Sequence, residues 1–239
     1  MIYAANWKMH GSRAMADTLE KGASESLPLM RQEDEIMLFV PSLYVNELAA
    51  RSANSQLSIG AQNCHHETAG AYTGEISAQM IADAGASWVL LGHSERRAQA
   101  GESNSLIAQK AATAHQAGLN LMVCIGEDAA QNEAGLTKEV LSAQLEAVLP
   151  ELKKAKRAVI AYEPIWSIGT GKLATLEAIA DIHHFIKEVA SGLPVLYGGS
   201  VKPENAGDIC GLEPVDGVLV GGASLKAADF RAICTARPS

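Results

Sequence analysis

Short polar motifs follow several apolar runs of this chain, and their residue types are those that handle protons and oxyanions. Asn6 and Lys8 stand two residues apart at the end of one run, so in an extended strand both side chains point to the same face. An amide and an ammonium group on one face suit a carbonyl or phosphate oxygen. An ordinary solvated strand end has the same composition, so this pair alone is a weak indication.

A histidine and a glutamate follow two further apolar runs. His93 comes shortly after Trp88–Leu91, where it would stand as a general acid or electrophile. Glu163 follows Ala158–Tyr162 and precedes an apolar segment, and a poorly solvated carboxylate is more basic than one in water. Glu163 is therefore a candidate base. The competing interpretations are a structural histidine and a surface salt bridge.

Glycines mark two further features. Residues 164–171 have the composition of a hinged lid, because proline stiffens the first edge, glycines free the other, and the middle is apolar enough to close over a substrate. The pairs Gly198-Gly199 and Gly221-Gly222 each precede a helical stretch, where backbone N–H groups can hold a phosphate. Tight turns would use the same glycines. Because the pairs follow the last two apolar runs, where barrels characteristically bind phosphate, phosphate binding is favoured.

Eight short apolar runs must position these groups. Their near-continuous hydrophobicity predicts strands buried on both faces, as in a parallel sheet covered by helices. Helical spacing between the runs is clearest over 103–117, 137–149 and 176–189. The predicted strands are Ile2–Trp7, Ile36–Val40, Leu57–Ala61, Trp88–Leu91, Leu119–Cys124, Ala158–Tyr162, Val195–Tyr197 and Val215–Val220.

Eight successive right-handed βα units predict an α/β chain folded as one closed, parallel (β/α)8 barrel. We expect a single domain over residues 1–239, because barrels of ~200–250 residues form one domain and no linker interrupts the pattern. An open doubly wound sheet is the alternative. In a barrel the carboxyl ends of the strands share one rim, so the polar motifs would meet there.

Composition excludes several classes of function. The net charge of −8 and only 19 scattered Lys and Arg argue against nucleic-acid binding. No apolar run approaches the ~18–20 residues that span a bilayer, and no nucleotide motif or metal-ligand spacing occurs. The four cysteines suit neither a zinc site nor a disulfide scaffold. We expect reduced thiols, a cytoplasmic location, no cofactor, no metal, and neither a nucleic-acid nor a membrane partner.

Seven blocks of this chain together resemble triosephosphate isomerase, and they follow that family's order over the whole length. No single block is decisive, but all of them at predicted strand ends make a chance match very unlikely. The blocks are 6–9 (NWKM), 60–63 (GAQN), 92–97 (GHSERR), 124–127 (CIGE), 161–171 (AYEPIWSIGTG), 197–200 (YGGS) and 219–222 (LVGG).

The resemblance implies interconversion of dihydroxyacetone phosphate and D-glyceraldehyde 3-phosphate, a step of glycolysis and gluconeogenesis. Glu163 would be the base that moves a proton between C1 and C2 through an enediol, and neutral His93 would polarise the carbonyl. Lys8 and Asn6 would complete the oxyanion site. Glu95 would organise Lys8 and the loop of His93.

The resemblance also implies how the substrate is held and enclosed. Backbone N–H groups would bind the phosphate, and the lid would gate the site, a use for which this family is a standard example. The phosphate positions are Gly169, Ser200, Gly221 and Gly222, and the lid includes Pro164, Ile165, Trp166, Ser167, Ile168, Thr170 and Gly171.

The loop over 62–75 resembles the family's interdigitating loop. In that loop the position of Thr73 reaches the neighbouring subunit near Asn6 and Lys8, which predicts a symmetric homodimer. The departures from the family pattern are Ser167 for alanine, Ile165 for valine and His10 for asparagine, together with slight shortening at the N-terminus and near 190–194. We expect them to affect lid kinetics or stability rather than the reaction.

Two other functions stay open on the sequence. Another phosphosugar barrel enzyme would keep the glycine pairs but need a different base, and a catalytically silent barrel would have lost a catalytic residue or a lid glycine. Lys8, His93 and Glu163 all stand in isomerase contexts, which disfavours both.

Overall fold

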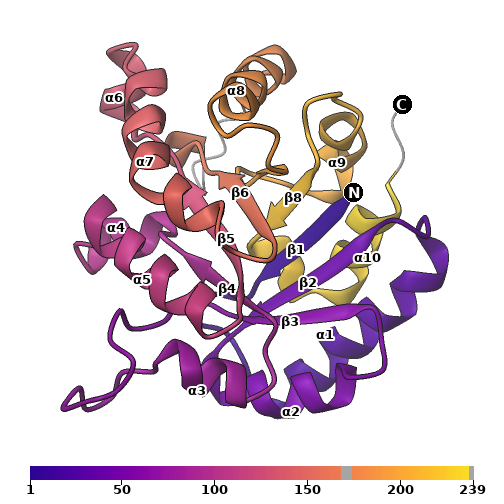
Figure 1. The fold of residues 1–239 in the computed structure, drawn as a ribbon. Helices are drawn as coiled ribbons and strands as arrows, with labels where there is room; N and C mark the ends of the chain where they lie inside the picture. The colour runs from indigo at the N-terminus through magenta and orange to yellow at the C-terminus, as the bar shows by residue number, and fades with distance from the viewer. Residues whose placement is uncertain (168–173, 237–239) are drawn as a thin grey trace.

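The computed structural model describes residues 1–167 and 174–236, and eight parallel strands in it close into a barrel in chain order (Figure 1). The barrel closes because the first strand pairs with the last, from Ile2 beside Gly217 to Ala5 beside Val220. This pairing excludes the open-sheet alternative. The strands are β1 (Ile2–Asn6), β2 (Glu35–Val40), β3 (Leu57–Ala61), β4 (Trp88–Leu91), β5 (Asn120–Ile125), β6 (Ala158–Tyr162), β7 (Val195–Tyr197) and β8 (Gly217–Val220).

Helices surround the ring of strands (Figure 1). The α-helices are α1 (Arg13–Ser26), α2 (Ser42–Ser52), α3 (Ala78–Asp83), α4 (Ser94–Gln99), α5 (Asn104–Gln116), α6 (Ala129–Glu133), α7 (Thr137–Leu152), α8 (Leu176–Val189), α9 (Pro203–Cys210) and α10 (Ala227–Thr235). The short 3-10 helices of residues 1–167 and 174–236 are η1 (Leu27–Leu29), η2 (Ile165–Ser167) and η3 (Gly222–Leu225). Among the described residues, no helix is long and apolar enough to cross a membrane.

Burial on both faces explains the unbroken apolar strands, as predicted. Alternate residues of β1 belong to two separate cores: Ile2 and Ala4 pack inside the barrel, whereas Tyr3 and Ala5 pack outward against helices. Trp88 is buried in the inner core. With apolar neighbours on both sides, each strand holds its carboxyl end, and the polar residue that follows it, in a fixed position.

The predicted boundaries need small corrections. β1 ends at Asn6 rather than Trp7, because the backbone turns into a left-handed conformation at Lys8, where φ is 52°. β5 is displaced by one residue, and β8 begins at Gly217 rather than Val215. Helix α7 runs past the predicted end to Leu152, with Pro150 in its last turn.

The segment after β3 makes a long excursion before α3. Residues 67–75 are exposed, and in Figure 1 the purple loop projects away from the barrel beside α3. The loop returns to the barrel through one parallel bridge between His65 and Ser77. Thr73 lies in its exposed part.

Candidate active site

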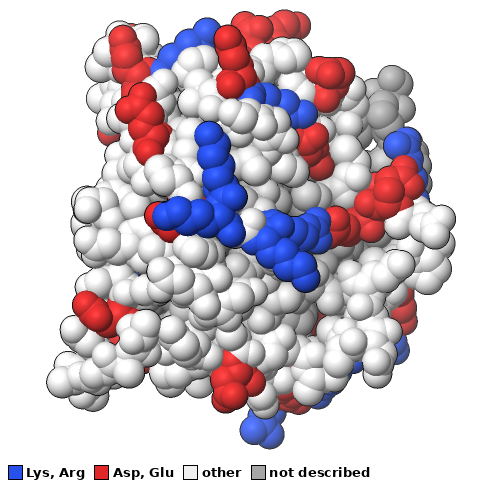
Figure 2. Space-filling model, in the orientation of Figure 1, with Lys and Arg blue, Asp and Glu red and all other residues white. Residues whose placement is uncertain are grey.

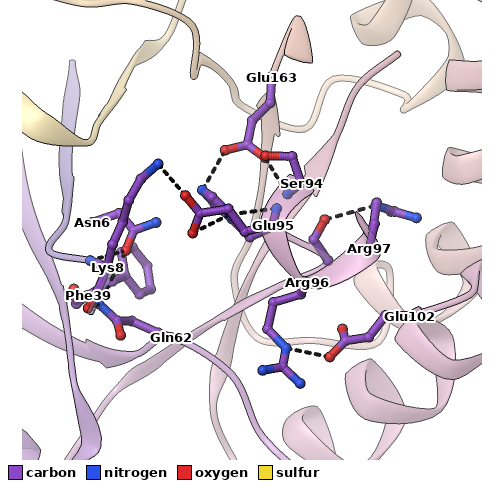
Figure 3. A network of polar contacts seen from close by, with 12 residues as sticks. Asn6, Lys8, Phe39, Gln62, Ser94, Glu95, Arg96, Arg97, Glu102 and Glu163 are labelled. Atoms are coloured by element: carbon purple, nitrogen blue, oxygen red, sulfur yellow. Dashed lines mark hydrogen bonds and ion pairs between the residues drawn. The ribbon is translucent and has the colours of Figure 1, made fainter. Parts of the chain in front are cut away.

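The end of β1 places Asn6 and Lys8 at the rim of the barrel. The Asn6 side-chain oxygen accepts a hydrogen bond from the Lys8 N–H at 2.9 Å, which supports the turn that Lys8 makes. The Lys8 ammonium then reaches across to Glu95, with its Nζ 2.6 Å from Oε1 (Figure 3). Glu95 is half exposed, so this pair orients Lys8 more than it stabilises the fold.

His93 is the cap residue of α4, directly after Gly92 turns the chain away from β4 with a φ of 67°. Its Nδ1 lies 3.2 Å from the Glu95 N–H and accepts that hydrogen bond. A nitrogen that accepts cannot also carry a proton, so the proton of the neutral ring resides on Nε2. The helix end of α4 thus presents His93 to the cavity as a hydrogen-bond donor.

Glu163 accepts the hydrogen bond from the His93 ring. Its Oε1 lies 3.0 Å from His93 Nε2. Its Oε2 accepts the Ser94 N–H at 3.0 Å (Figure 3). The carboxylate is only 2% exposed. Burial alone would raise the pKa of Glu163, but His93 and the Ser94 N–H stabilise the charged form and bring this pKa below its ordinary value. The carboxylate is therefore ionised, and its pKa lies below the ordinary value rather than above it, as the sequence had suggested, because these partners outweigh its poor solvation.

A cavity of about 460 Å³ opens beside these groups. Asn6, Lys8, His93 and Glu163 line one part of it, and the glycine-rich ends of β7 and β8 line the other. The predicted phosphate positions Ser200, Gly221 and Gly222 are all among the lining residues. The cavity thus joins a proton-handling end to a glycine-rich end, as the sequence predicts.

The absence of a side chain has a different steric consequence at each of the two glycines after β8. A Cβ on Gly221 would lie 3.2 Å from the Lys8 Cε, so the bare glycine lets Lys8 extend past it. A Cβ on Gly222 would meet nothing within 4 Å, which leaves open space for a ligand beside the backbone. Gly169, the fourth predicted phosphate position, lies outside the described residues.

The first part of the predicted lid is described, from Pro164 to the short helix η2. Glu127, buried after β5, anchors it: its Oε1 accepts from the Trp166 Nε1 at 2.7 Å and from the Tyr162 hydroxyl at 3.2 Å. Ile165 is partly buried and Ser167 is buried. The remaining lid positions, Ile168, Thr170 and Gly171, lie outside the described residues.

Two glycines that hold Glu163 in place were not among the predicted site residues. A Cβ on Gly126 would lie 1.8 Å from the Glu163 carbonyl oxygen, and a Cβ on Gly198 would lie 3.0 Å from the Glu163 Cγ. Any other residue at Gly126 must therefore displace the base. The sequence does show both glycines after predicted strands. Their contact with Glu163, however, depends on β5, β6 and β7 being neighbours in the barrel.

A second cavity of about 530 Å³ adjoins the first and shares Asn6, Lys8 and His93 with it. Its other walls include Gln62, Glu95 and Gln99. Within the described part of the chain, no group of three His, Cys, Asp or Glu residues is placed to hold a metal ion.

These features define a class of protein: a barrel enzyme that moves protons within a small anionic substrate. The family model for triosephosphate isomerase matches residues 1–237. The triosephosphate isomerase of Ruegeria pomeroyi is 47% identical, with 98% of this chain and 96% of that protein covered. That of Bradyrhizobium diazoefficiens is 42% identical, with 99% and 97% covered.

A solved structure agrees with the family model and with these two relatives. The crystal structure of triosephosphate isomerase from Bartonella henselae superposes with a TM-score of 0.87 at 36% identity, covering 98% of this chain and 97% of that one. This chain belongs to the triosephosphate isomerase family.

Proposed function

We propose that this chain interconverts dihydroxyacetone phosphate and D-glyceraldehyde 3-phosphate, with Glu163 as the base that carries the proton. One observation supports the assignment most strongly. A buried, ionised carboxylate shares a cavity with an imidazole whose Nε2–H faces it, an ammonium group and a glycine-rich wall. Every group that an enediol route requires faces that one space.

In the proposed reaction Glu163 removes a proton from C1 of the ketone, and the electrons of that bond move toward the carbonyl oxygen. The oxygen gains negative charge, which the His93 Nε2–H, the Lys8 ammonium and the Asn6 amide stabilise. A proton then moves from the C1 hydroxyl to the C2 oxygen, for which the His93 Nε2–H is placed as donor and then acceptor. Glu163 returns its proton to C2, which gives the aldehyde at C1 and a hydroxyl at C2. Substrate must first take over the hydrogen bonds that His93 and Glu163 make to one another.

We propose that the backbone N–H groups of Ser200, Gly221 and Gly222, with Gly169, bind the phosphate. This group is remote from the reacting carbons, so its binding free energy can drive closure of the lid over 164–171 and exclusion of water. The anchoring of Trp166 by Glu127 supports a defined starting position for the first edge of that lid. Glu95 would keep Lys8 and the His93 loop in register.

The test replaces the base without changing its size. Glu163→Gln should lower kcat at least about 100-fold in a coupled assay for either triose phosphate, because the amide cannot accept a proton. Glu188→Gln on the exposed face of α8 is the matched control and should keep full activity. Activity of a folded Glu163→Gln variant within about tenfold of the parent would contradict the assignment.

We further propose a symmetric homodimer, a single domain over 1–239 and a cytoplasmic location. The projecting loop with Thr73 is exposed in one subunit, and the second cavity beside Asn6 and Lys8 is open to receive such a loop from a partner. The free cysteines fit a reducing compartment, where glycolytic and gluconeogenic enzymes act on their phosphorylated substrates.

A further inference from the structure

Gln62 lies where the ends of three strands meet, and none of the roles described above includes it. It directly follows β3, and its Nε2 faces three oxygens: Asn6 Oδ1 at 3.2 Å, the Lys8 carbonyl at 3.0 Å and the Phe39 carbonyl at 3.1 Å (Figure 3). Two of these are backbone carbonyls, which can only accept. They leave the Gln62 amide one orientation, with its NH2 group toward β1 and β2.

The orientation of Gln62 in turn determines that of Asn6. The Asn6 oxygen receives two donors, the Gln62 Nε2 and the Lys8 N–H. A reversed Asn6 amide would set its own NH2 group against both. The NH2 group of Asn6 therefore points away from them; it has no hydrogen bond to a described residue, and Asn6 lines the cavity of His93 and Glu163. Its donors are left for a ligand.

Gln62 also holds the backbone of Lys8. With a φ of 52°, Lys8 adopts the left-handed conformation, which is unfavourable for a residue that has a Cβ. Both of its backbone polar groups are engaged, the N–H by Asn6 and the carbonyl by Gln62. Without Gln62, one of the two hydrogen bonds that hold the Lys8 backbone in this conformation is lost.

We propose that Gln62 is a positioning residue that keeps the Asn6 NH2 group directed into the cavity and holds Lys8 in its left-handed conformation. The inference rests on the proposed function, because it assigns the Asn6 donor to the oxygen that gains charge. It concerns the reacting end of the substrate. The phosphate end, formed by the loops after β7 and β8, makes none of the hydrogen bonds described for Gln62.

The test removes the Gln62 amide but keeps its length. Gln62→Met should lower kcat about 10- to 100-fold, because a donor aimed at the developing charge is no longer held in place. Inhibition by inorganic phosphate should be unchanged. In an Asn6→Ala background the same substitution should cost at least about threefold less than in the parent, since one of the two residues through which it acts is gone and the contact with the Lys8 carbonyl alone remains. Gln116→Met, on the exposed end of α5, is the control.

A second measurement separates this inference from the proposed function. By calorimetry, Gln62→Met should weaken binding of 2-phosphoglycolate, a phosphorylated carboxylate with the shape of the enediolate, by about tenfold and leave phosphate binding alone. That result needs no turnover, so it stands even if triose phosphates are not interconverted. Equal weakening of both ligands, or an effect of Gln62→Met that is fully additive with Asn6→Ala, would overturn the proposal.

Gln62→Glu provides a second variant if Gln62→Met does not fold. Its carboxylate would face the Lys8 and Phe39 carbonyls with acceptors only and would draw the Asn6 NH2 group back from the cavity. We expect a larger fall in kcat than for Gln62→Met. A folded Gln62→Glu protein with kcat within about threefold of the parent would equally overturn the proposal.

Discussion

Single residues in this barrel carry charge states that their surroundings impose, and His183 shows this outside the active site. It lies fully buried on α8, with its ring 6.1 Å from that of Tyr162 and 6.3 Å from that of Tyr197. Burial lowers the pKa of His183 to about 4. The folded protein thus keeps this imidazole neutral over a range where an unfolded chain would protonate it.

His183 should make the stability of the protein sensitive to acid. Above the unfolded pKa of ~6.5 the ring is neutral in both states; as the pH falls toward 4, only the unfolded chain binds the proton. The free energy of unfolding should therefore decrease by up to about 3 kcal/mol over this window. Urea unfolding of the parent and of His183→Phe at several pH values measures the difference.

The neighbouring histidine is the control for that experiment. The side chain of His184 is 61% exposed, so His184→Phe makes the same replacement on α8 at a site in contact with water. A difference in unfolding free energy between the parent and His183→Phe that does not change between pH 7 and about pH 4.5 would show that the ring titrates normally in the fold.

At the scale of elements, a buried ion cluster fastens helices to the rim of the site. Glu102, between α4 and α5, accepts from the Lys110 Nζ at 2.6 Å and from Arg96, and Lys110 also donates to Asn63 beyond β3 at 2.8 Å. Burial raises the pKa of Glu102, but Lys110 and Arg96 more than offset this and lower it below its ordinary value. The cluster thus joins α4, α5 and the end of β3.

Breaking this cluster should be costly. Glu102→Gln leaves the Lys110 ammonium, which is only 5% exposed, without its carboxylate, and should reduce the free energy of unfolding by about 3 kcal/mol at pH 7. The stabilisation from a carboxyl group of lowered pKa is present above its unfolded pKa and is lost as the pH falls through its folded pKa, so the variant should differ less from the parent in acid.

An exposed pair provides the comparison. Lys21 and Glu25 on α1 lie 3.9 Å apart with most of their side-chain surface in water, and Glu25→Gln should cost less than about 1 kcal/mol. If Glu102→Gln proved no more costly than Glu25→Gln in denaturant titrations, burial would not be what makes the cluster strong.

Elements were more predictable from the sequence than the contacts between them. Because each strand is buried on both faces, it appears in the sequence as an apolar run, and the polar residues that follow it lie at the rim of the barrel. Asn6, His93 and Glu163 could therefore be found without coordinates. The steric role of Gly126 and the three acceptors of Gln62 could not, because they join residues from different strands. Spacing along one strand contains no information about how its neighbours are aligned.

At the scale of the whole molecule, the net charge of −8 does not gather at the cavity. Three lysines and three carboxylates line it: Lys8, Lys202, Lys226, Glu163, Glu204 and Asp229. Acidic and basic side chains are also interspersed on the face shown in Figure 2, with a group of basic ones near its centre. The charged residues that line the cavity balance one another and therefore produce little net field to attract or repel a dianion.

Substrate capture should accordingly depend weakly on salt. We expect kcat/KM to change less than about threefold when sodium chloride rises from about 0.05 to about 0.3 M, because steering by a net field is absent and the close contacts are short compared with the screening length. Chloride is preferred to sulfate, which would compete for a phosphate site. A steep loss of kcat/KM would reveal a directed positive field around the cavity.

The proposed dimer gives a further expectation at this scale. Sedimentation at micromolar concentration should show a particle of twice the 25.1 kDa chain mass, because in the proposed twofold pair the projecting loop of one subunit would enter the second cavity of the other. Shortening the loop around Thr73 should shift the particle toward the single-chain mass. A 25.1 kDa species from the intact chain would refute the dimer.

The pairing of β1 with β8 has a consequence for how this enzyme is made. Asn6 and Lys8 emerge from the ribosome long before Gly221 and Gly222, and the seam between Ile2–Ala5 and Gly217–Val220 brings them together. Until then the nascent sheet has an unpaired edge that another chain can join. Synthesis of β8 and the residues that follow it is therefore the event that both closes this edge and assembles the active site.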